Sequence, residues 1–292
     1  MGMGMGMGLG RCAVVGGATG RGAHGLVEVV EHGDGVVGIE LNAPKSLNAL
    51  TVAMGEDLGE VVSSLQASDS PAKAVVVTGR GRAFSAGGDL GFLTDRGADR
   101  PDSNTAHMMA FYKAFLAIRG IPVPVLAAIN GHAVGAGCCF AMAADVRIVH
   151  AQAKLGFNFA RIGLHPGMGA THFLPKLIGM QAASQLLLTG ELVPGTKAAE
   201  LGMAAQVVDA AEDPDSPIGP TYQAAIDMAR VMATETSPLT SRQLVKTLRA
   251  KIDVGLEEAL MREADCQAHS YGSDEYHARL AALIARTSSS AK

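Results

Sequence analysis

The chain has 292 residues, enough for one large domain or for one domain with an appended region. Hydrophobic residues make up 48% of it and the formal net charge is -4, so a sizeable core can form, and neither the basic footprint of a nucleic-acid-binding protein nor a polybasic membrane patch is present. Aromatic residues are 4% and Trp is absent, which argues against base stacking, and no apolar run approaches the roughly 18 residues of a membrane helix.

The first 25 residues differ from the rest. They contain the repeat MGMGMGMG and the glycine-rich run GGATGRGAHG, a composition that cannot build a core, so we predict a disordered extension over residues 1–25. The run GATGRG lacks the Lys-Ser/Thr pair of a phosphate loop. Arg11 and Arg21 precede the first acid, Glu28, which leaves a weak transit peptide as the alternative. We expect a cytoplasmic protein, or one of the mitochondrial matrix under that alternative.

The four cysteines favour a reducing compartment. Cys138 and Cys139 are adjacent at an apolar helix start, which is a poor place for a disulfide, and Cys12 and Cys266 lie far away in sequence. No group of His and Cys has the spacing of metal ligands, so no metal site is predicted.

Hydrophobic periodicity predicts strand-then-helix units followed by helices alone, which indicates an α/β fold. The polar segment 95–104 is predicted to be a mobile surface loop. The run DPDSP at 213–217 is the clearest linker, and it divides a core domain (26–215) from a C-terminal helical region (216–292). In chain order the pattern predicts strand 26–31, strand 36–41, helix 51–66, strand 73–78, helix 105–119, strand 125–129, helix 138–144, strand 146–150, helices 170–178, 181–188 and 196–201, strand 205–208, and helices 220–235, 238–250, 255–268 and 274–286.

Two glycine- and alanine-rich loops carry the functional signal. One follows the strand at 73–78 and reads GRGRAFSAGGDL (79–90); the other reads INGHAVGAGC (129–138) and opens a helix. Small residues let another molecule approach the backbone, and the first amides of a helix lack internal partners at its positive end. Such amides can bind and stabilise a developing oxyanion.

These two loops resemble the paired signatures of the crotonase family, the enoyl-CoA hydratase/isomerase family. The resemblance covers residues 26–286 and includes LNAPKSLNAL (41–50), RIGLHPGMGAT (161–171) and TGELVPGTKAAELGM (189–203) in matching order and spacing. It implies a crotonase-like spiral of ββα units with a C-terminal helical trimerisation region, a homotrimer or dimer of trimers, and a role in fatty acid metabolism. It implies an acyl-CoA thioester as partner, with coenzyme A as part of the substrate and no other cofactor.

The resemblance also assigns site residues. The amides of Ala86 and Ala136 are expected to form the oxyanion hole, the alternative being that both are small only for packing. The bent CoA is expected to be gripped by Lys45, Ser46 and Leu47 together with Ala86, Gly87, Gly88 and Asp89. Lys45 is expected to meet a phosphate unless it is a solvated surface residue.

The positions where family members carry their acid/base residues hold no acidic residue in this chain. Hydratases of this family carry two Glu residues where this chain has Cys139 and Phe159, and isomerases often carry an acid where it has Gly167. Phe159 is then a substrate contact that cannot transfer a proton. Cys139 near a helix start and His165 in a loop are the candidate replacements, each weighed against a structural role. His132 is a weaker candidate.

Two functions remain open at this point. One is an acyl-CoA isomerase, lyase or atypical hydratase that stabilises a thioester enolate. The other is a catalytically inactive acyl-CoA carrier or sensor that kept the fold and lost the acids. Asp89 and Asp145 are interpreted as structural residues, a helix cap and a turn.

Overall fold

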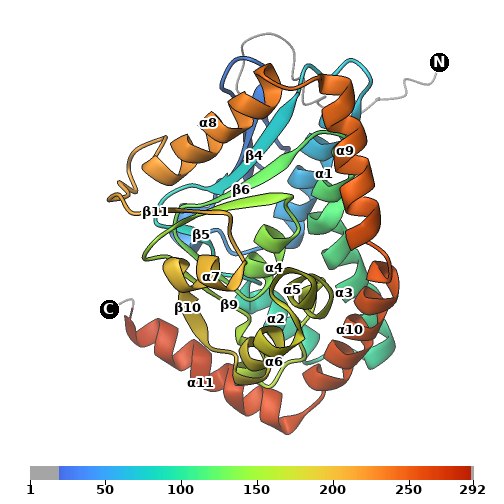
Figure 1. Cartoon of the computed structure of the whole chain (residues 1–292). Coiled ribbons are helices and arrows are strands. Elements are labelled where there is room, and N and C mark those ends of the chain that lie inside the picture. The colour runs from blue at the N-terminus through green and yellow to red at the C-terminus, as the bar shows by residue number, and fades with distance from the viewer. Residues whose placement is uncertain (1–19, 291–292) are drawn as a thin grey trace, which may run out of the picture.

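The computed structural model describes residues 20–290, with the side chains of Arg21 and of residues 287–290 left out. Its strands form two sheets, with helices gathered around them and along the C-terminal half (Figure 1). The first sheet has the strand order β1-β2-β3-β4-β6-β8-β11, and the second has the order β10-β9-β7-β5. The strands are β1 (Gly20–Arg21), β2 (Val27–Glu31), β3 (Val36–Leu41), β4 (Ala74–Gly79), β5 (Ala83–Ser85), β6 (Val125–Ile129), β7 (His132–Val134), β8 (Val146–His150), β9 (Lys154–Gly156), β10 (Leu192–Pro194) and β11 (Gln206–Val208).

The first sheet is buried on both faces, which explains its valine-rich strands. Strands β3, β4, β6, β8 and β11 are parallel, with Val75 of β4 opposite Val125 of β6. Along β4, Val75 and Val77 face the main core under helix α1 (Val52–Gln66), and Val76 faces a second core under helix α8 (Pro220–Thr234). Alternating residues therefore enter two different cores, as a doubly covered parallel sheet requires.

The second sheet consists of short strands that continue the first. Strands β5, β7 and β9 follow β4, β6 and β8 after a few residues each, and they pair in parallel as their predecessors do. Asn130, between β6 and β7, is bonded to the neighbouring turn between β4 and β5. Its Nδ2 donates to the carbonyls of Gly79 (2.8 Å) and Gly81 (2.9 Å). This arrangement confirms the predicted crotonase-like α/β fold, although the sequence analysis predicted none of these three-residue strands.

The helices match the prediction closely except over residues 90–104, where the predicted elements include no helix at α2 (Leu90–Arg96) and a loop is predicted over 95–104. Helix α3 begins at Pro101, so the end of the segment 95–104 is helical and not a loop. Asn104 is buried in its first turn and donates to the Arg96 carbonyl at 2.8 Å. The remaining helices are α2 (Leu90–Arg96), α3 (Pro101–Leu116), α4 (Ala136–Met142), α5 (Ala170–Ile178), α6 (Met180–Thr189), α7 (Gly195–Leu201), α9 (Pro238–Ile252), α10 (Leu256–Tyr271) and α11 (Asp274–Ser290), with short 3-10 turns η1 (Pro44–Ser46), η2 (Ala117–Gly120) and η3 (Asn158–Ile162).

The C-terminal helices are packed onto the sheets and not set apart from them. Helix α8 covers one face of the first sheet, α9 runs down the side, α10 lies along α3, and α11 crosses the end of the molecule (Figure 1). Arg249 ties α9 to the sheet: its Nε and Nη2 donate to the two carboxylate oxygens of Asp145, at 2.8 and 2.5 Å. The division at residue 216 stays a prediction, but the first helix beyond it belongs to the second core.

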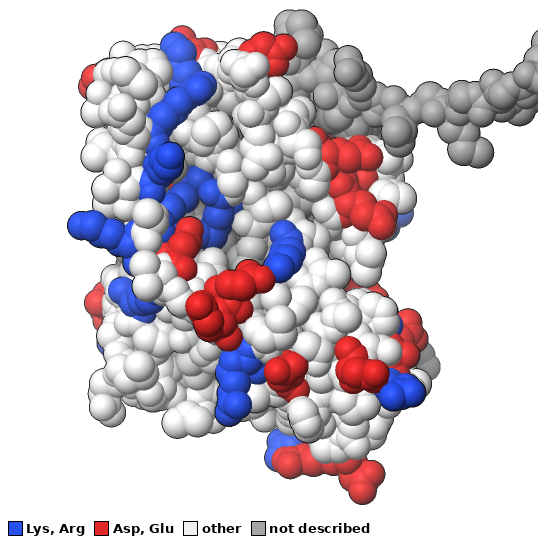
Figure 2. Space-filling model, turned by 90° about the vertical axis from the view of Figure 1, so that its right-hand side faces the viewer, with Lys and Arg blue, Asp and Glu red and all other residues white. Residues whose placement is uncertain are grey.

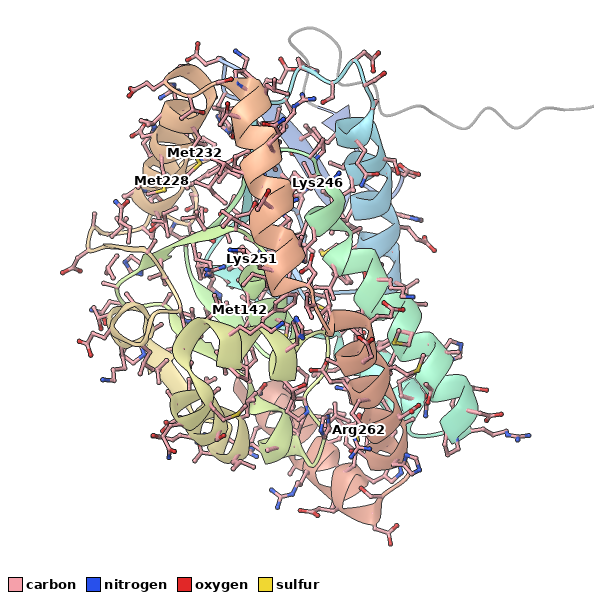
Figure 3. The ribbon with its side chains drawn as sticks, turned by 45° about the vertical axis from the view of Figure 1, so that its right-hand side comes forward. Met142, Met228, Met232, Lys246, Lys251 and Arg262 are labelled. Carbon is pink, nitrogen blue, oxygen red and sulfur yellow. The ribbon has the colours of Figure 1, made fainter. Side chains whose placement is uncertain are left out.

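The outer side of α9 and α10 carries charges of both signs. Figure 2 looks onto this side and shows a column of basic side chains on one half, with acidic side chains in separate groups. Lys246 and Lys251 project from α9 and Arg262 from α10 (Figure 3). On the inner side of α9, Met142 and Met232 line a cavity of about 450 Å³.

Near the N-terminus, Gly20 and Arg21 pair with β2 as strand β1. The predicted extension over residues 1–25 is therefore wrong for residues 20–25, and residues 1–19 lie outside the described part of the chain. Within residues 20–290, no helix is both long and apolar enough to cross a membrane.

Candidate active site

A narrow pocket opens where the two glycine-rich loops meet helices α3 and α10. Its walls are apolar over most of their area and come from seven segments of the chain. It is lined by Ala86, Gly87, Gly88, Leu90, Phe92, Leu93, Met108, Phe111, Tyr112, Gly135, Ala136, Asn158, Phe159, Ile162, Leu164, Gly167, Met168, Gln267, Tyr271 and Leu283.

The first loop presents a different amide from the one expected. The Ala86 N–H donates to the Leu47 carbonyl at 2.9 Å, so it is not free to bind a substrate oxygen. The Gly87 N–H donates to Ser85 Oγ (3.2 Å) and the Asp89 N–H to the Leu50 carbonyl (3.1 Å). The Gly88 amide between them has no acceptor among residues 20–290. The free donor of this loop is therefore Gly88, and the assignment of Ala86 is corrected.

The second loop presents Ala136 as expected. Gly135 precedes helix α4 with φ +55° and ψ -124°, a conformation that favours glycine, and its own N–H donates to the Gly156 carbonyl at 2.8 Å. Ala136 is the first residue of α4, so its N–H lacks a partner within the helix and lies at the positive end of the helix dipole. Its side chain is buried, and the residue lines the pocket.

The two loops are in direct contact. A Cβ atom built on Gly87 would lie 2.6 Å from the Val134 carbonyl oxygen and 3.5 Å from the Ala136 nitrogen. Any side chain at position 87 would therefore push the loops apart. With glycine there, the Gly88 and Ala136 amides line one pocket, which is the arrangement of an oxyanion hole.

Cys139 does not reach this pocket. It lies one turn into α4, is fully buried, and its Sγ donates to the Gly167 carbonyl at 3.3 Å. Burial, followed by the neighbouring Cys138 and Glu263, raises its pKa well above the usual value for a thiol. The thiol is protonated at neutral pH, so we assign Cys139 to the core and withdraw it as an acid/base candidate.

His165 and His132 are also placed outside the pocket. His165 turns its ring onto the Pro166 carbonyl (Nδ1 to O, 2.6 Å), and its half-burial lowers its pKa, so the ring is neutral. Only its backbone carbonyl points toward the pocket, where it accepts from Gln267. His132 accepts from the Lys154 N–H and lies in a separate cavity at the bends between the sheets. Neither ring is positioned for acid/base chemistry at the paired amides.

The pocket holds three polar side chains that the sequence analysis missed. Tyr112 Oη donates to Gln267 Oε1 at 2.7 Å, and Gln267 Nε2 donates to the His165 carbonyl at 2.8 Å. Asn158 lies beside Gly135, with its Oδ1 3.1 Å from where a Cβ on that glycine would be. Tyr112 and Gln267 are 155 residues apart, and the one signal available was the polar Gln267 at an inward position of an amphipathic helix.

Comparison with known proteins agrees with this geometry. The family model described as enoyl-CoA hydratase/isomerase matches residues 31–284. A Mycobacterium tuberculosis protein named probable enoyl-CoA hydratase EchA14 is 36% identical over 262 residues, which cover 88% of this chain and 96% of that protein. The chain belongs to the enoyl-CoA hydratase/isomerase family.

Other members cover the chain equally well. The 1,2-epoxyphenylacetyl-CoA isomerase of Escherichia coli is 31% identical over 87% of this chain and 94% of its own length. Among solved structures, an enoyl-CoA hydratase/isomerase from Mycobacterium paratuberculosis superposes with a TM-score of 0.76 at 27% identity, covering 88% of this chain and 97% of that one. These relatives include both hydratases and isomerases. Enzymes of this family act on CoA thioesters and use no cofactor beyond the CoA of the substrate.

The residues predicted to stand at the acid positions of the family are not carboxylates. Phe159 and Gly167 both line the pocket, and no Asp or Glu is among the pocket residues of the described chain. A carboxylate close behind the pocket, Glu263, is fully buried and accepts from the N–H groups of Gly169 (2.7 Å) and Thr171 (2.8 Å). It therefore caps the start of α5 and faces away from the pocket's open space.

On the expected CoA side, the loop 44–50 is joined to the first oxyanion loop. The Leu47 and Leu50 backbones bond to residues 86, 87 and 89, and Leu47 takes φ +54°. Lys45 and Ser46 are exposed beside this junction. Asp89 caps helix α2 through the Phe92 N–H (3.1 Å), as predicted. Asp145 accepts from the Val125 N–H (2.8 Å) and pairs with Arg249, so its role is structural.

Proposed function

We propose that this protein binds an acyl-CoA thioester with its carbonyl oxygen between the Gly88 and Ala136 amides, and that it stabilises the enolate formed there. The observation that carries the proposal is the pair of amides: neither has an acceptor among residues 20–290, and both belong to residues that line one pocket. A donor of this kind contributes roughly 2.7–4 kcal/mol to a transition state that carries charge on oxygen. The acyl chain then extends past Phe159 toward α3 and α10, and the CoA passes Lys45, Ser46 and Leu47.

The reaction class follows from what the pocket lacks. Ordinary hydration in this family uses two carboxylates to hold and activate a water molecule, and this chain has Cys139 and Phe159 in their places. The Tyr112 hydroxyl is neutral, since burial raises its pKa well above the ordinary value for a phenol, so it can donate a hydrogen bond but cannot serve as a base. We therefore favour an isomerase or lyase reaction, with water as the proton carrier, over syn-hydration.

The proposal is tested by turnover of a panel of 2-enoyl-, 3-enoyl-, 3-hydroxyacyl- and 3-oxoacyl-CoA esters. An Ala136→Pro variant is the informative one, because proline is well accepted at the first position of a helix and replaces the N–H group by a ring carbon that cannot donate. Turnover of at least one ester by the wild type, reduced about 100-fold or more in this variant, is expected. Turnover that is unchanged by the variant would show that the amide is not used.

The second candidate is a non-catalytic acyl-CoA carrier or sensor. It is favoured by the absence of any carboxylate from the pocket residues of the described chain. Under this alternative, acyl-CoA raises the melting temperature and Ala136→Pro lowers that shift, while no ester of the panel is converted. Conversion of any ester that depends on Ala136 excludes it.

A homotrimer, or a dimer of trimers, is part of the proposal. Helix α9 exposes three leucine side chains by 55–67%: Leu239, Leu244 and Leu248. Such a row of apolar side chains in contact with water is unusual in a monomer. Burial of this face against a second copy would remove that contact. Analytical ultracentrifugation, with Leu244→Lys/Leu248→Lys as the variant, tests the assembly: we expect the wild type to sediment as a trimer or hexamer and the variant as a monomer.

A further inference from the structure

The Tyr112–Gln267 pair is a buried, hydrogen-bonded polar feature in a pocket whose lining is mostly apolar. Tyr112 comes from α3 and Gln267 from α10, and both side chains are about 1% exposed. Neither residue is needed to complete a helix cap or a turn. An apolar acyl chain would be accommodated as well by Phe and Leu at these positions, without the cost of burying a hydroxyl and an amide.

The pair retains unused hydrogen-bonding capacity. Gln267 Nε2 carries two N–H groups, of which one donates to the His165 carbonyl at 2.8 Å. The second has no acceptor among residues 20–290. The Tyr112 oxygen gives its proton to Gln267 Oε1 and already has a backbone hydrogen bond with Met168, which leaves it at most one lone pair. A ligand oxygen between them can accept from the amide and, if it is a hydroxyl, also donate to the phenol.

The pair lies next to the position where the reacting carbons would be. A Cβ on Gly167 would fall 2.2 Å from Tyr112 Oη and 2.8 Å from Gln267 Nε2, so both atoms border this glycine. The Gly167 carbonyl accepts from Cys139, which stands one helical turn after the Ala136 amide. The pair therefore faces the first carbons of a chain whose thioester oxygen is held at Ala136.

We infer that Tyr112 and Gln267 are specificity-determining residues that select an acyl chain carrying an oxygen at its third carbon, as a 3-hydroxyacyl- or 3-oxoacyl-CoA does, over a plain hydrocarbon chain. This inference rests on the proposed binding of the thioester at Gly88 and Ala136. The selection comes from the second N–H group of Gln267, which Tyr112 holds in place: a hydrocarbon chain leaves this N–H buried without an acceptor, whereas a chain oxygen accepts from it. Sites built to bond a substrate oxygen discriminate strongly against analogues that lack it.

The test is competition of butyryl-CoA, 3-hydroxybutyryl-CoA and 3-oxobutyryl-CoA against a fluorescent CoA ester. The wild type is expected to bind the oxygenated esters about 10-fold more tightly than butyryl-CoA. Tyr112→Phe and Gln267→Leu are each expected to remove most of this preference and to bind butyryl-CoA at least as well as the wild type. Tyr276→Phe is the matched control, because it loses a buried hydroxyl bond of similar length, to the Leu93 carbonyl at 2.8 Å, outside the pocket lining. It should keep the preference.

Three results would overturn the inference. The wild type could bind all three esters equally, the Phe and Leu variants could keep the preference, or Tyr276→Phe could lose it to the same extent. If no CoA ester binds the wild type at all, the proposed function itself has failed. Equal binding of every ester refutes only the selection by Tyr112 and Gln267.

Discussion

The hydrogen bond from the Ala86 N–H to the Leu47 carbonyl, at 2.9 Å, decides which amide of the first glycine-rich loop can serve a substrate. It joins the loop 44–50 to the strand exit after β5 and leaves the Gly88 amide, two residues later, as the free donor. The proposed oxyanion donor of this loop is therefore Gly88 and not Ala86, and this difference can be tested by substitution.

Replacing Gly88 by Pro should remove the first oxyanion donor, whereas Gly88→Ala should keep it. A Cβ at this position meets no atom nearer than Leu93 Cδ2, at 3.9 Å, so the alanine variant fits without strain. Infrared spectroscopy of bound acyl-CoA labelled with ¹³C at the thioester carbonyl measures the effect without requiring turnover. The wild type and the alanine variant should shift the carbonyl stretch to lower frequency, and the proline variant should lose a large part of this shift.

A contrary outcome would be an unshifted band in the wild type, or an equal shift in all three proteins. The turnover of any ester found in the panel should fall about 100-fold in Gly88→Pro, the usual effect of removing one such donor.

Cys138 and Cys139 should be inert toward iodoacetamide in the folded protein. Both are fully buried, and burial raises the pKa of Cys138 to about 12 and that of Cys139 well above its ordinary value. Because the thiolate is the reacting form, their alkylation at pH 8 should be at least about 100-fold slower than that of the partly exposed Cys266. Peptide mapping by mass spectrometry follows each cysteine separately, and unfolding in guanidinium should equalise the rates. Fast, selective labelling of Cys139 in the folded state would restore it as a catalytic candidate.

Glu263 should make stability fall as the pH rises through its titration. Burial is the main cause that raises its pKa in the folded state, and hydrogen bonds from Thr171 and Gly169 reduce the shift only partly. The folded state therefore binds the proton more tightly than the unfolded state, whose pKa is close to 4.5. The contribution of Glu263 to stability is complete below that pH and is lost as the pH rises through the folded-state pKa.

The measurement is urea unfolding at a series of pH values from 4 upward, with Glu263→Gln as the reference. The glutamine side chain of the variant does not titrate. Its NH₂ group must face a backbone N–H, so Glu263→Gln should be less stable than the wild type by about 1–3 kcal/mol at pH values where Glu263 is protonated. The gap between the two proteins should narrow as the pH rises. A gap that stays constant or widens with pH would show that the folded-state pKa is not raised.

Arg249 should be among the most sensitive residues for stability. Besides Asp145, its guanidinium donates to the carbonyls of Arg119 (2.7 Å), Ile121 (2.5 Å) and Val123 (3.1 Å). Arg249→Met leaves these acceptors and a partly buried carboxylate without a partner, which should cost about 3–5 kcal/mol of unfolding free energy. Arg242→Met, on the exposed side of the same helix, should change it by less than about 0.5 kcal/mol. Equal effects of the two substitutions in chemical denaturation would contradict the assigned role of Arg249.

The sequence predicted the long elements because their signals are local. Thr51 caps α1 through the Met54 N–H (3.1 Å), and the apolar spacing Tyr222, Ala225, Ile226, Ala229 of α8 fits one helical face. Strands β5, β7 and β9 have three residues each, too few to show a period, and they exist because the longer strands before them are already paired. The start of α3 was missed because its first turn, PDSN, has the composition of a loop.

The site was harder to predict than the fold. Both loops were found from their small residues, but which amide remains free depends on Leu47 and Leu50, some 40 residues away from their partners. The polar contacts of the pocket, Tyr112 and Gln267, meet only because α3 and α10 pack together. No local pattern connects them.

The close approach of Gly87 to the Val134 carbonyl bears on when the site is built. No side chain fits between the two loops, and each loop is held by backbone bonds of its own: the first to Leu47 and Leu50, the second to Gly156. The donors are therefore preorganised. Their positions are set during folding, and binding of a thioester should change the conformation of the two loops very little. Exchange of the bonded amides of Ala86, Gly87, Asp89, Gly135 and Cys139 should then proceed through global unfolding, at nearly the same rate with and without ligand when the ligand's contribution to overall stability is subtracted.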